Sequence, residues 1–203
     1  MSAADFFSGV AASFQETDLI TWLATITAVI YVLLALKENI WCWSFGIISS
    51  GLSVGVYINA TFYYEAILNV LYVILGIYGW MMWARRDAEK SEAPVTRIPA
   101  RTLLTVCLIG VGASILLGYM GERFTNSDYP SSDALLASFG VIATWMTAKK
   151  YLENWLFWIA IDAASAVLYF IKGPSMYLFA LLFIFYTFMA VAGYFAWKKS
   201  LTH

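Results

Sequence analysis

Charged residues are scarce in this chain. Lys, Arg, Asp and Glu make up 12% of its 203 residues, whereas soluble domains carry about 25%. Hydrophobic residues reach 62%, and a soluble core of this size could not hide them without leaving large exposed apolar patches. The composition therefore indicates a membrane protein. The 12 Lys and Arg form no large basic surface, so we expect no nucleic-acid partner.

Side chains that bind metals or act as nucleophiles are also few. The single histidine is His203, and the two cysteines, Cys42 and Cys107, each lie inside a hydrophobic stretch. Such cysteines usually behave as small buried hydrophobes, and two alone do not indicate a disulfide framework or metal site. Because an enzyme needs a convergent catalytic set, we expect no enzymatic activity, no cofactor and no metal.

Lysine and arginine are absent from the last hydrophobic segment and from the first 18 residues. The final hydrophobic segment, from Gly173 to Trp197, contains no lysine, which excludes a seven-helix protein that holds retinal as a Schiff base. The first 18 residues contain no Lys or Arg, whereas a secretory signal begins with a positive region. We therefore expect an uncleaved, extracytoplasmic N-terminal segment.

Long hydrophobic runs fill the rest of the chain. Crossing a hydrocarbon core of ~30 Å takes about 20 apolar residues. Seven segments qualify, which predicts an all-α, polytopic membrane protein with seven transmembrane helices. The segments are Leu19–Leu36, Ile40–Ile58, Tyr64–Trp83, Arg101–Met120, Ser132–Ala148, Asn154–Ile171 and Pro174–Trp197.

Positive residues gather on one side of these spans. In short loops they normally stay in the cytoplasm. The side that holds the N-terminus has only Arg123 and Lys172, whereas the other side has ten, which predicts an outside N-terminus and a cytoplasmic C-terminus. The ten are Lys37, Arg85, Arg86, Lys90, Arg97, Arg101, Lys149, Lys150, Lys198 and Lys199.

The first three spans resemble the last three. The loops LKENIWCWSF and YLENWLFWIA align when Glu38-Asn39 is placed on Glu153-Asn154, an offset of 115 that pairs Trp43 with Trp158 and Ser50 with Ser165. The third and seventh spans match at an offset of 114, through Tyr63 and Tyr177, Tyr72 and Tyr186, Gly79 and Gly193, and Trp83 and Trp197.

A single span between the two units lets both run in the same direction. Parallel repeats of this kind are one known transporter plan, with the substrate held between them near mid-membrane. The predicted organisation is an N-terminal segment (1–18), a first repeat (19–83), a cytoplasmic linker (84–100) that we interpret as a mobile tether, a linker helix (101–120), a second repeat (132–197) and a cytoplasmic tail (198–203).

Asp162 is the only charged residue deep inside a span. A carboxylate in lipid costs roughly 3 kcal/mol on insertion scales, so it should face the interior of the bundle and have a partner. Side chains at steps of three and four residues share one helical face. The face of Asp162 carries Trp155, Trp158, Ser165, Tyr169 and Lys172.

Similar polar and aromatic faces occur on two other spans. Trp43 and Ser50 lie on the second, and Asn69 and Tyr72 on the third. Other readings stay open at this point: Asp162 could pair structurally within the bundle, and Lys172 could be a snorkelling interfacial residue. We interpret the remaining tryptophans of the cytoplasmic side as an interfacial aromatic belt: Trp41, Trp80, Trp83, Trp145 and Trp197.

Such a lining suits a flat, positively charged ring. Each cation–π contact contributes roughly 0.5–2 kcal/mol, a carboxylate adds charge complementarity, and Asn, Ser and Tyr can bond to hydroxyl groups. A cationic heteroaromatic ring joined to a sugar would use every element of this face.

The run ENWLFWIAIDAASAVLYFIKG resembles the PnuC family of bacterial nicotinamide riboside transporters. The resemblance covers roughly Leu19 to Lys199, and its motif falls on Asn154, Trp155, Trp158 and Asp162. In the first repeat Ile40 and Ile47 stand where the 115 offset places Trp155 and Asp162, so we expect the second repeat to dominate the site.

The resemblance implies a SWEET-like fold of three, one and three helices in the bacterial inner membrane. It also implies facilitated diffusion of nicotinamide riboside, trapping of the substrate by a cytoplasmic riboside kinase, and a homo-oligomer, with a trimer as the form. Two alternatives stay open: a related transporter for another vitamin or nucleoside such as thiamine or riboflavin, and a SWEET-type sugar transporter.

Overall fold

The computed structural model describes residues 3–59, 63–88, 95–125 and 128–201. Part of the predicted linker (89–94) and His203 lie outside these residues. Within them the chain forms eight α-helices, one short 3₁₀ helix and no strand beyond two isolated bridges. The helices are α1 (Ala3–Glu16), α2 (Leu19–Leu36), α3 (Cys42–Asn59), α4 (Tyr63–Ala88), α5 (Ala100–Phe124), α6 (Pro130–Ala148), α7 (Asn154–Lys172), η1 (Pro174–Met176) and α8 (Tyr177–Lys199).

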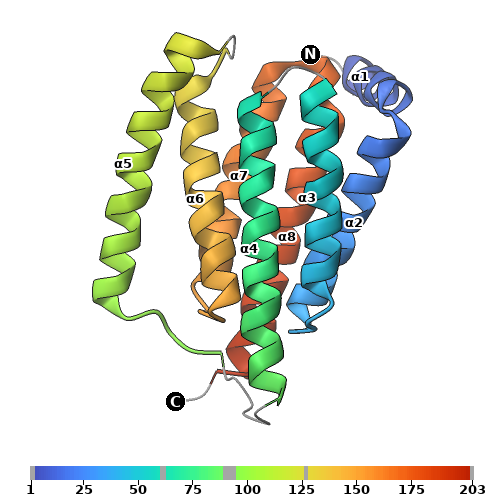
Figure 1. The fold of residues 1–203 in the computed structure, drawn as a ribbon. Helices are drawn as coiled ribbons and strands as arrows, with labels where there is room; N and C mark the ends of the chain where they lie inside the picture. Colours follow the sequence, from blue (N-terminus) through green and yellow to red (C-terminus); the bar gives the residue numbers. More distant parts are fainter. Residues whose placement is uncertain (1–2, 60–62, 89–94, 126–127, 202–203) are drawn as a thin grey trace.

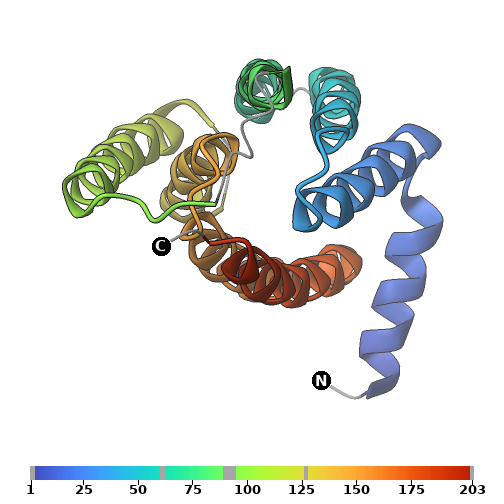
Figure 2. The ribbon, with the colours of Figure 1, turned by 90° about the horizontal axis from the view of Figure 1, so that it is seen from below.

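Six of the helices form a ring. Each of α2, α3 and α4 packs on the next, as do α6, α7 and α8, and the ring closes where α4 meets α6 and where α2 meets α8 (Figures 1 and 2). Helix α5 lies outside the ring against α6. It returns the chain between the two units, so α2, α4, α6 and α8 all run from the same end of the bundle to the other (Figure 1).

The outer surface of the bundle is strongly apolar. Five helices of the described chain are by themselves long and apolar enough to cross a membrane, namely α2, α4, α5, α7 and α8. Leucine and isoleucine side chains on α5, such as Leu108 and Ile115, are more than 60% exposed. A bundle with such a surface is stable only in lipid. The multi-pass membrane architecture is therefore confirmed, and α3 and α6 run alongside these five helices (Figure 1).

The turn between α2 and α3 repeats the turn between α6 and α7. In each, two successive N–H groups donate to carbonyls three and five residues earlier, those of Glu38 and Asn39 in the first turn and of Lys150 and Tyr151 in the second. Glu38 and Lys150 also share a left-handed backbone, with φ of 54° and 57°. Such a conformation costs a non-glycine residue about 1–3 kcal/mol. Its occurrence at both places matches the turns at an offset of 112.

The predicted offset of 115 for these loops is therefore wrong. At 112, Trp43 corresponds to Trp155 rather than to Trp158, and Ser50 corresponds to Asp162. The two Glu-Asn pairs that suggested 115 are not equivalent, because Glu153 accepts a hydrogen bond from the N–H of Ile98 in the linker. The shared Glu-Asn dipeptide gave the wrong alignment, because the geometry of the turns cannot be read from the sequence.

The later helices do match at the predicted offset of 114. A Cβ added to Gly193 would stand 2.6 Å from the ring of Trp155, and one added to Gly79 would collide in the same way with Trp43. Each repeat thus seats one tryptophan ring directly on a glycine of its last helix. Small residues such as glycine permit this close approach between helices.

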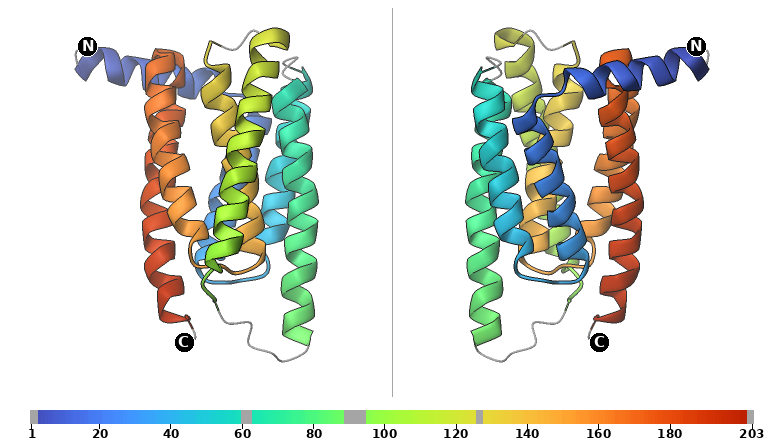
Figure 3. Two further views of the ribbon diagram at one scale, coloured as in Figure 1. Left: turned by 90° about the vertical axis from the view of Figure 1, so that its left-hand side faces the viewer. Right: turned by 90° about the vertical axis from the view of Figure 1, so that its right-hand side faces the viewer.

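Helix α1 was not predicted from the sequence. It lies across one end of the bundle, transverse to the other helices (Figure 3). The Ser13 hydroxyl donates to the carbonyls of Pro174 (3.2 Å) and Ser175 (2.8 Å), and the ring of Phe6 stacks on Tyr177 at 5.2 Å. The segment ends at Asp18, which caps α2 by accepting a hydrogen bond from the Thr21 N–H.

The last part of the predicted tether packs against the turn between α6 and α7. Val95 is fully buried, and Thr96 bonds on both sides to the α6–α7 turn: its N–H donates to Lys150 O (3.1 Å) and its carbonyl accepts from Leu152 N–H (2.9 Å). Linker residues 95–98 therefore brace the turn that carries Lys150.

Candidate functional site: a cavity between the two repeats

A cavity of about 460 Å³ lies inside the ring and is lined by all six of its helices. That volume falls in the range of small-molecule sites. Nine of the ten predicted site residues line it: Trp43, Ser50, Asn69, Tyr72, Trp155, Trp158, Asp162, Tyr169 and Lys172. Ser165 lines it as well, so the whole predicted face of α7 points inward.

Asp162 is 6% exposed and lies on the cavity wall. We expected a protein partner for this carboxylate. In the part of the chain that the structure describes, no hydrogen bond or ion pair reaches it. A buried carboxylate without a partner is costly in a membrane, and this one faces the cavity.

The two tryptophans of α7 occupy different environments. Trp155 is only 4% exposed, lies against Gly193 and meets Trp197 edge to face at 5.4 Å. Trp158 is half-buried, and its indole N–H donates to the Thr147 hydroxyl at 3.4 Å. Trp155 is therefore held mainly by protein, whereas Trp158 presents more of its ring to the cavity.

Asn154 does not line the cavity. Its amide donates to the Tyr151 carbonyl (2.6 Å) and its amide oxygen accepts from the Thr147 hydroxyl (3.1 Å), with no exposed surface. These bonds fix the first turn of α7. Asn154 thus positions Thr147, which does line the cavity and contacts Trp158.

Charged side chains lie toward the end of the cavity near η1. Lys172 forms an ion pair with Asp133 of α6 (3.0 Å), and its ammonium lies 5.4 Å from the ring of Tyr169. Glu65 also lines this part of the wall. Together with Asp162, the lining carries three carboxylates and one ammonium group, so the field in the cavity favours cations.

Several lining residues were missed. Tyr186 of α8 lines the cavity with a buried hydroxyl that has no hydrogen-bond partner among the described residues. Its match to Tyr72 in the repeat could have identified it. Tyr72 of α4 contacts Gly140 of α6. This contact between repeats could not be predicted from the spacing of residues in the sequence. Tyr31 and Thr144 line the cavity as well.

Tryptophans fill the end of the cavity that lies opposite η1. Trp43, Trp83 and Trp197 are at most 2% exposed, and Trp43 meets Trp83 edge to face at 5.6 Å. The assignment of Trp83 and Trp197 to an interfacial belt is therefore wrong, because their rings are buried between the repeats. Trp41, at 58% exposure, does lie on the surface.

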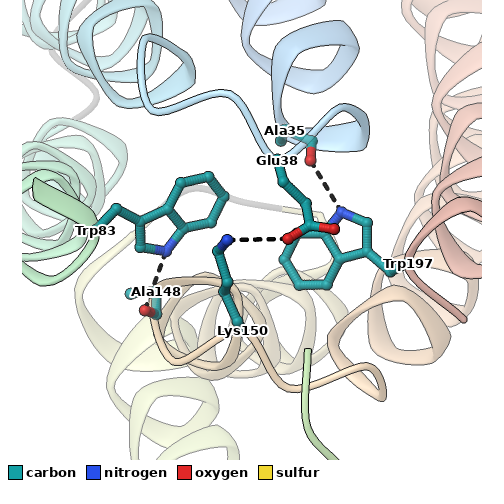
Figure 4. A network of polar contacts seen from close by, with 6 residues as sticks. All are labelled: Ala35, Glu38, Trp83, Ala148, Lys150 and Trp197. Carbon is teal, nitrogen blue, oxygen red and sulfur yellow. Dashed lines mark hydrogen bonds and ion pairs between the residues drawn. The ribbon is translucent and has the colours of Figure 1, made fainter. Parts of the chain in front are cut away.

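Trp83 and Trp197 each form a hydrogen bond to the other repeat. The Trp83 indole N–H donates to Ala148 O at 3.2 Å, and that of Trp197 donates to Ala35 O at 3.0 Å. Between them Lys150 and Glu38 form an ion pair of 2.9 Å (Figure 4). The two repeats are thus joined at this end by polar contacts that cross from one to the other.

The profile of the family described as nicotinamide mononucleotide transporter matches residues 18–199. The chain belongs to this family. The predicted resemblance is thereby confirmed, and the protein is a membrane transporter rather than an enzyme.

Curated relatives of this family member are named nicotinamide riboside transporter PnuC. The one from Escherichia coli (strain K12) is 25% identical over 229 residues, which cover 97% of this chain and 95% of the relative. The one from Neisseria mucosa is 28% identical over 195 residues, covering 88% and 73%. These bacterial relatives agree with the predicted setting, a multi-pass protein of a bacterial inner membrane.

The fold of this transporter is also that of a solved structure described as the crystal structure of the vitamin B3 transporter PnuC. The two share a TM-score of 0.72 at 21% sequence identity, and the match covers 99% of this chain and 93% of the other. Nearly the whole chain, α1 included, therefore has a counterpart of known fold.

Proposed function

We propose that this transporter carries nicotinamide riboside, as the names of its relatives suggest. The observation that carries the proposal is the carboxylate of Asp162, which is 94% buried, faces the cavity and has no partner among the described side chains. The pyridinium ring of the riboside carries the positive charge that would balance it. Trp158 offers a ring face for the same cation.

The sugar half of the substrate fits the hydroxyl-rich part of the wall. The ribose hydroxyl groups can both donate and accept hydrogen bonds, and so can the hydroxyls of Ser50, Tyr72 and Tyr186. The Tyr186 hydroxyl has no bond partner in the described chain, and a buried hydroxyl usually acquires one. A substrate hydroxyl would supply it.

The charge of the cavity argues for the riboside over its phosphorylated form. The description of the family names the mononucleotide, whereas the curated relatives are named for the riboside. A phosphate adds nearly two negative charges to a cavity that already holds three carboxylates and one ammonium group. We propose that this repulsion excludes the mononucleotide.

We propose facilitated diffusion with metabolic trapping. Among the lining residues Asp162 is the only acidic group deep in the bundle, whereas proton relays usually need chains of such groups. Phosphorylation of the riboside by a cytoplasmic kinase would convert it into a form that the cavity repels. Uptake would then be driven by the kinase rather than by an ion gradient.

For the topology we propose that α2 to α8 all cross the membrane, as two parallel repeats in a SWEET-like plan. The ten Lys and Arg of the predicted cytoplasmic side support an outside N-terminus. In the described chain α5 packs only on α6, and we propose that its free face takes part in a homo-oligomer, a trimer.

Calorimetry on the purified protein tests the substrate assignment. We expect nicotinamide riboside to bind at least tenfold more tightly than nicotinamide mononucleotide, nicotinamide, thiamine, riboflavin or glucose. The mononucleotide is the matched control, because it differs from the riboside only by its phosphate. A clear signal for another compound without one for the riboside would overturn the assignment, and a glucose signal would favour the sugar-transporter alternative.

A further inference from the structure

The ion pair between Glu38 and Lys150 joins the two repeats at the tryptophan-filled end of the cavity. The Lys150 ammonium lies 2.9 Å from the Glu38 carboxylate and 4.7 Å from the ring centre of Trp83. Both side chains are largely shielded, at 12% and 22% exposure. Shielded pairs are far less screened than surface ones, and breaking one leaves a poorly solvated charge.

The two residues occupy equivalent places in the repeats. Each stands at the left-handed position of its turn, with φ of 54° and 57°, and the tryptophan of the opposite repeat donates to a carbonyl a few residues before it. The pair therefore joins equivalent turns of the two repeats (Figure 4). It must break if the two repeats separate at this end.

The pair is also placed where the cavity ends. Ala35, which accepts from Trp197, lines the cavity, and so does Thr147, next to the acceptor Ala148. The turn of Lys150 is braced from outside by Thr96 of the linker. The contacts between repeats at this end include two indole–carbonyl bonds and one ion pair.

We infer that Glu38 and Lys150 form the latch of the inner gate, whose opening releases substrate to the side where Lys and Arg gather. This inference rests on the proposed transport function and deepens it by assigning residues to the gate. Left-handed backbone at two non-glycine residues supports the assignment, because strained residues persist where surrounding structure holds them and concentrate at switch regions. The two Trp–carbonyl bonds open together with the ion pair.

Cysteine accessibility measures the gate without any substrate. Thr144, a 7% exposed cavity residue, is replaced by Cys in a full-length C42A/C107A background. A cationic, membrane-impermeant thiol reagent is then applied to inside-out and right-side-out membrane vesicles. The latch variants are Glu38→Gln, Glu38→Lys, Lys150→Glu and the exchange E38K/K150E.

We expect Glu38→Lys and Lys150→Glu to raise the labelling rate from the inner side at least tenfold, since each places like charges face to face. Glu38→Gln should raise it less. The exchange should return the rate to within threefold of the unmodified latch, because a lysine at residue 38 would be placed relative to Trp197 as Lys150 is relative to Trp83. Lys198→Glu is the matched control. It reverses a charge at the same end of the bundle, but Lys198 is exposed and forms no ion pair or cation–π contact in the described chain, so the rate should stay within twofold.

Two results would overturn the latch: unchanged labelling in every variant, or an exchange variant that labels as fast as the single variants. If a single reversal fails to fold, Glu38→Gln and the exchange still decide. The outcome is separable from the substrate assignment. If the labelling rate changes in the latch variants as expected but the protein does not bind the riboside, only the substrate assignment is rejected. If the protein binds the riboside but the labelling rate is the same in every variant, only the gate is rejected.

Discussion

Replacing Asp162 with Asn is expected to weaken binding of nicotinamide riboside by about 2–5 kcal/mol, the usual effect of removing one partner of a buried charge pair. In affinity this corresponds to a loss of about 30- to 5,000-fold. The substitution keeps the shape of the side chain and removes the charge that faces the cavity. Because no protein group bonds to this carboxylate in the described chain, the fold should not depend on it.

The control for this prediction is an uncharged ligand of the same shape. The reduced dihydropyridine form of the riboside has a neutral ring, so its affinity should change by less than threefold between the native protein and the Asn variant. Calorimetry gives both affinities, and thermal unfolding in detergent should show a midpoint equal to or above that of the native protein. Equal losses for the charged and the neutral ligand would contradict a charge-pairing role for Asp162.

The two tryptophans of α7 should respond to substitution in opposite ways. Trp155→Ala removes a ring that is 4% exposed and seated on Gly193 and Trp197, so it should lower the free energy of unfolding by about 3–5 kcal/mol. Trp158→Ala removes a half-buried ring of the cavity wall. It should leave the unfolding midpoint nearly unchanged and weaken riboside binding by about 2 kcal/mol, roughly 30-fold.

Thermal unfolding and calorimetry on both variants separate the two roles. Trp158→Phe serves as the control, since it keeps an aromatic face and should retain most of the affinity. If Trp158→Ala binds the riboside as tightly as the native protein, the residue does not contact substrate. If Trp155→Ala unfolds at the native temperature, the packing role assigned to that residue is wrong.

The inward face of α7 could be predicted from the sequence, because spacing within a single helix determines which side chains share a face. Residues three and four apart share a face whatever the neighbours are, and one charge in the middle of an apolar span must point away from lipid. Those two rules placed Asp162, Trp158 and Tyr169 on one wall. The cavity adds what lies opposite, such as Tyr186 and Tyr31, which depends on how helices pack.

Interactions that cross between repeats could not be predicted in the same way. Trp83 and Trp197 have the sequence context of an interfacial belt, but the fold buries them between the repeats, where carbonyls of the opposite repeat accept their hydrogen bonds. Asn154 belongs to the expected motif, yet the bonds of its amide to Tyr151 and Thr147 hold it outside the cavity wall. Its match to the motif still leaves a contact with substrate as a prediction.

Helix α1 could not be predicted for a different reason. Its length of 14 residues is below what a span needs, so hydropathy assigned it to a plain N-terminal segment. It is stabilised by bonds to Pro174 and Ser175, far away in the chain. Short helices held by such distant contacts carry little local signal.

Uptake by proteoliposomes tests whether the protein transports nicotinamide riboside by facilitated diffusion. Liposomes that contain the purified transporter, loaded with a riboside kinase and ATP, are given labelled nicotinamide riboside with and without a proton gradient. We predict that the labelled riboside accumulates only when the kinase is present and that the proton gradient has no effect. Labelled nicotinamide mononucleotide should not accumulate. Accumulation driven by the gradient alone, or uptake of the mononucleotide as fast as the riboside, would contradict it.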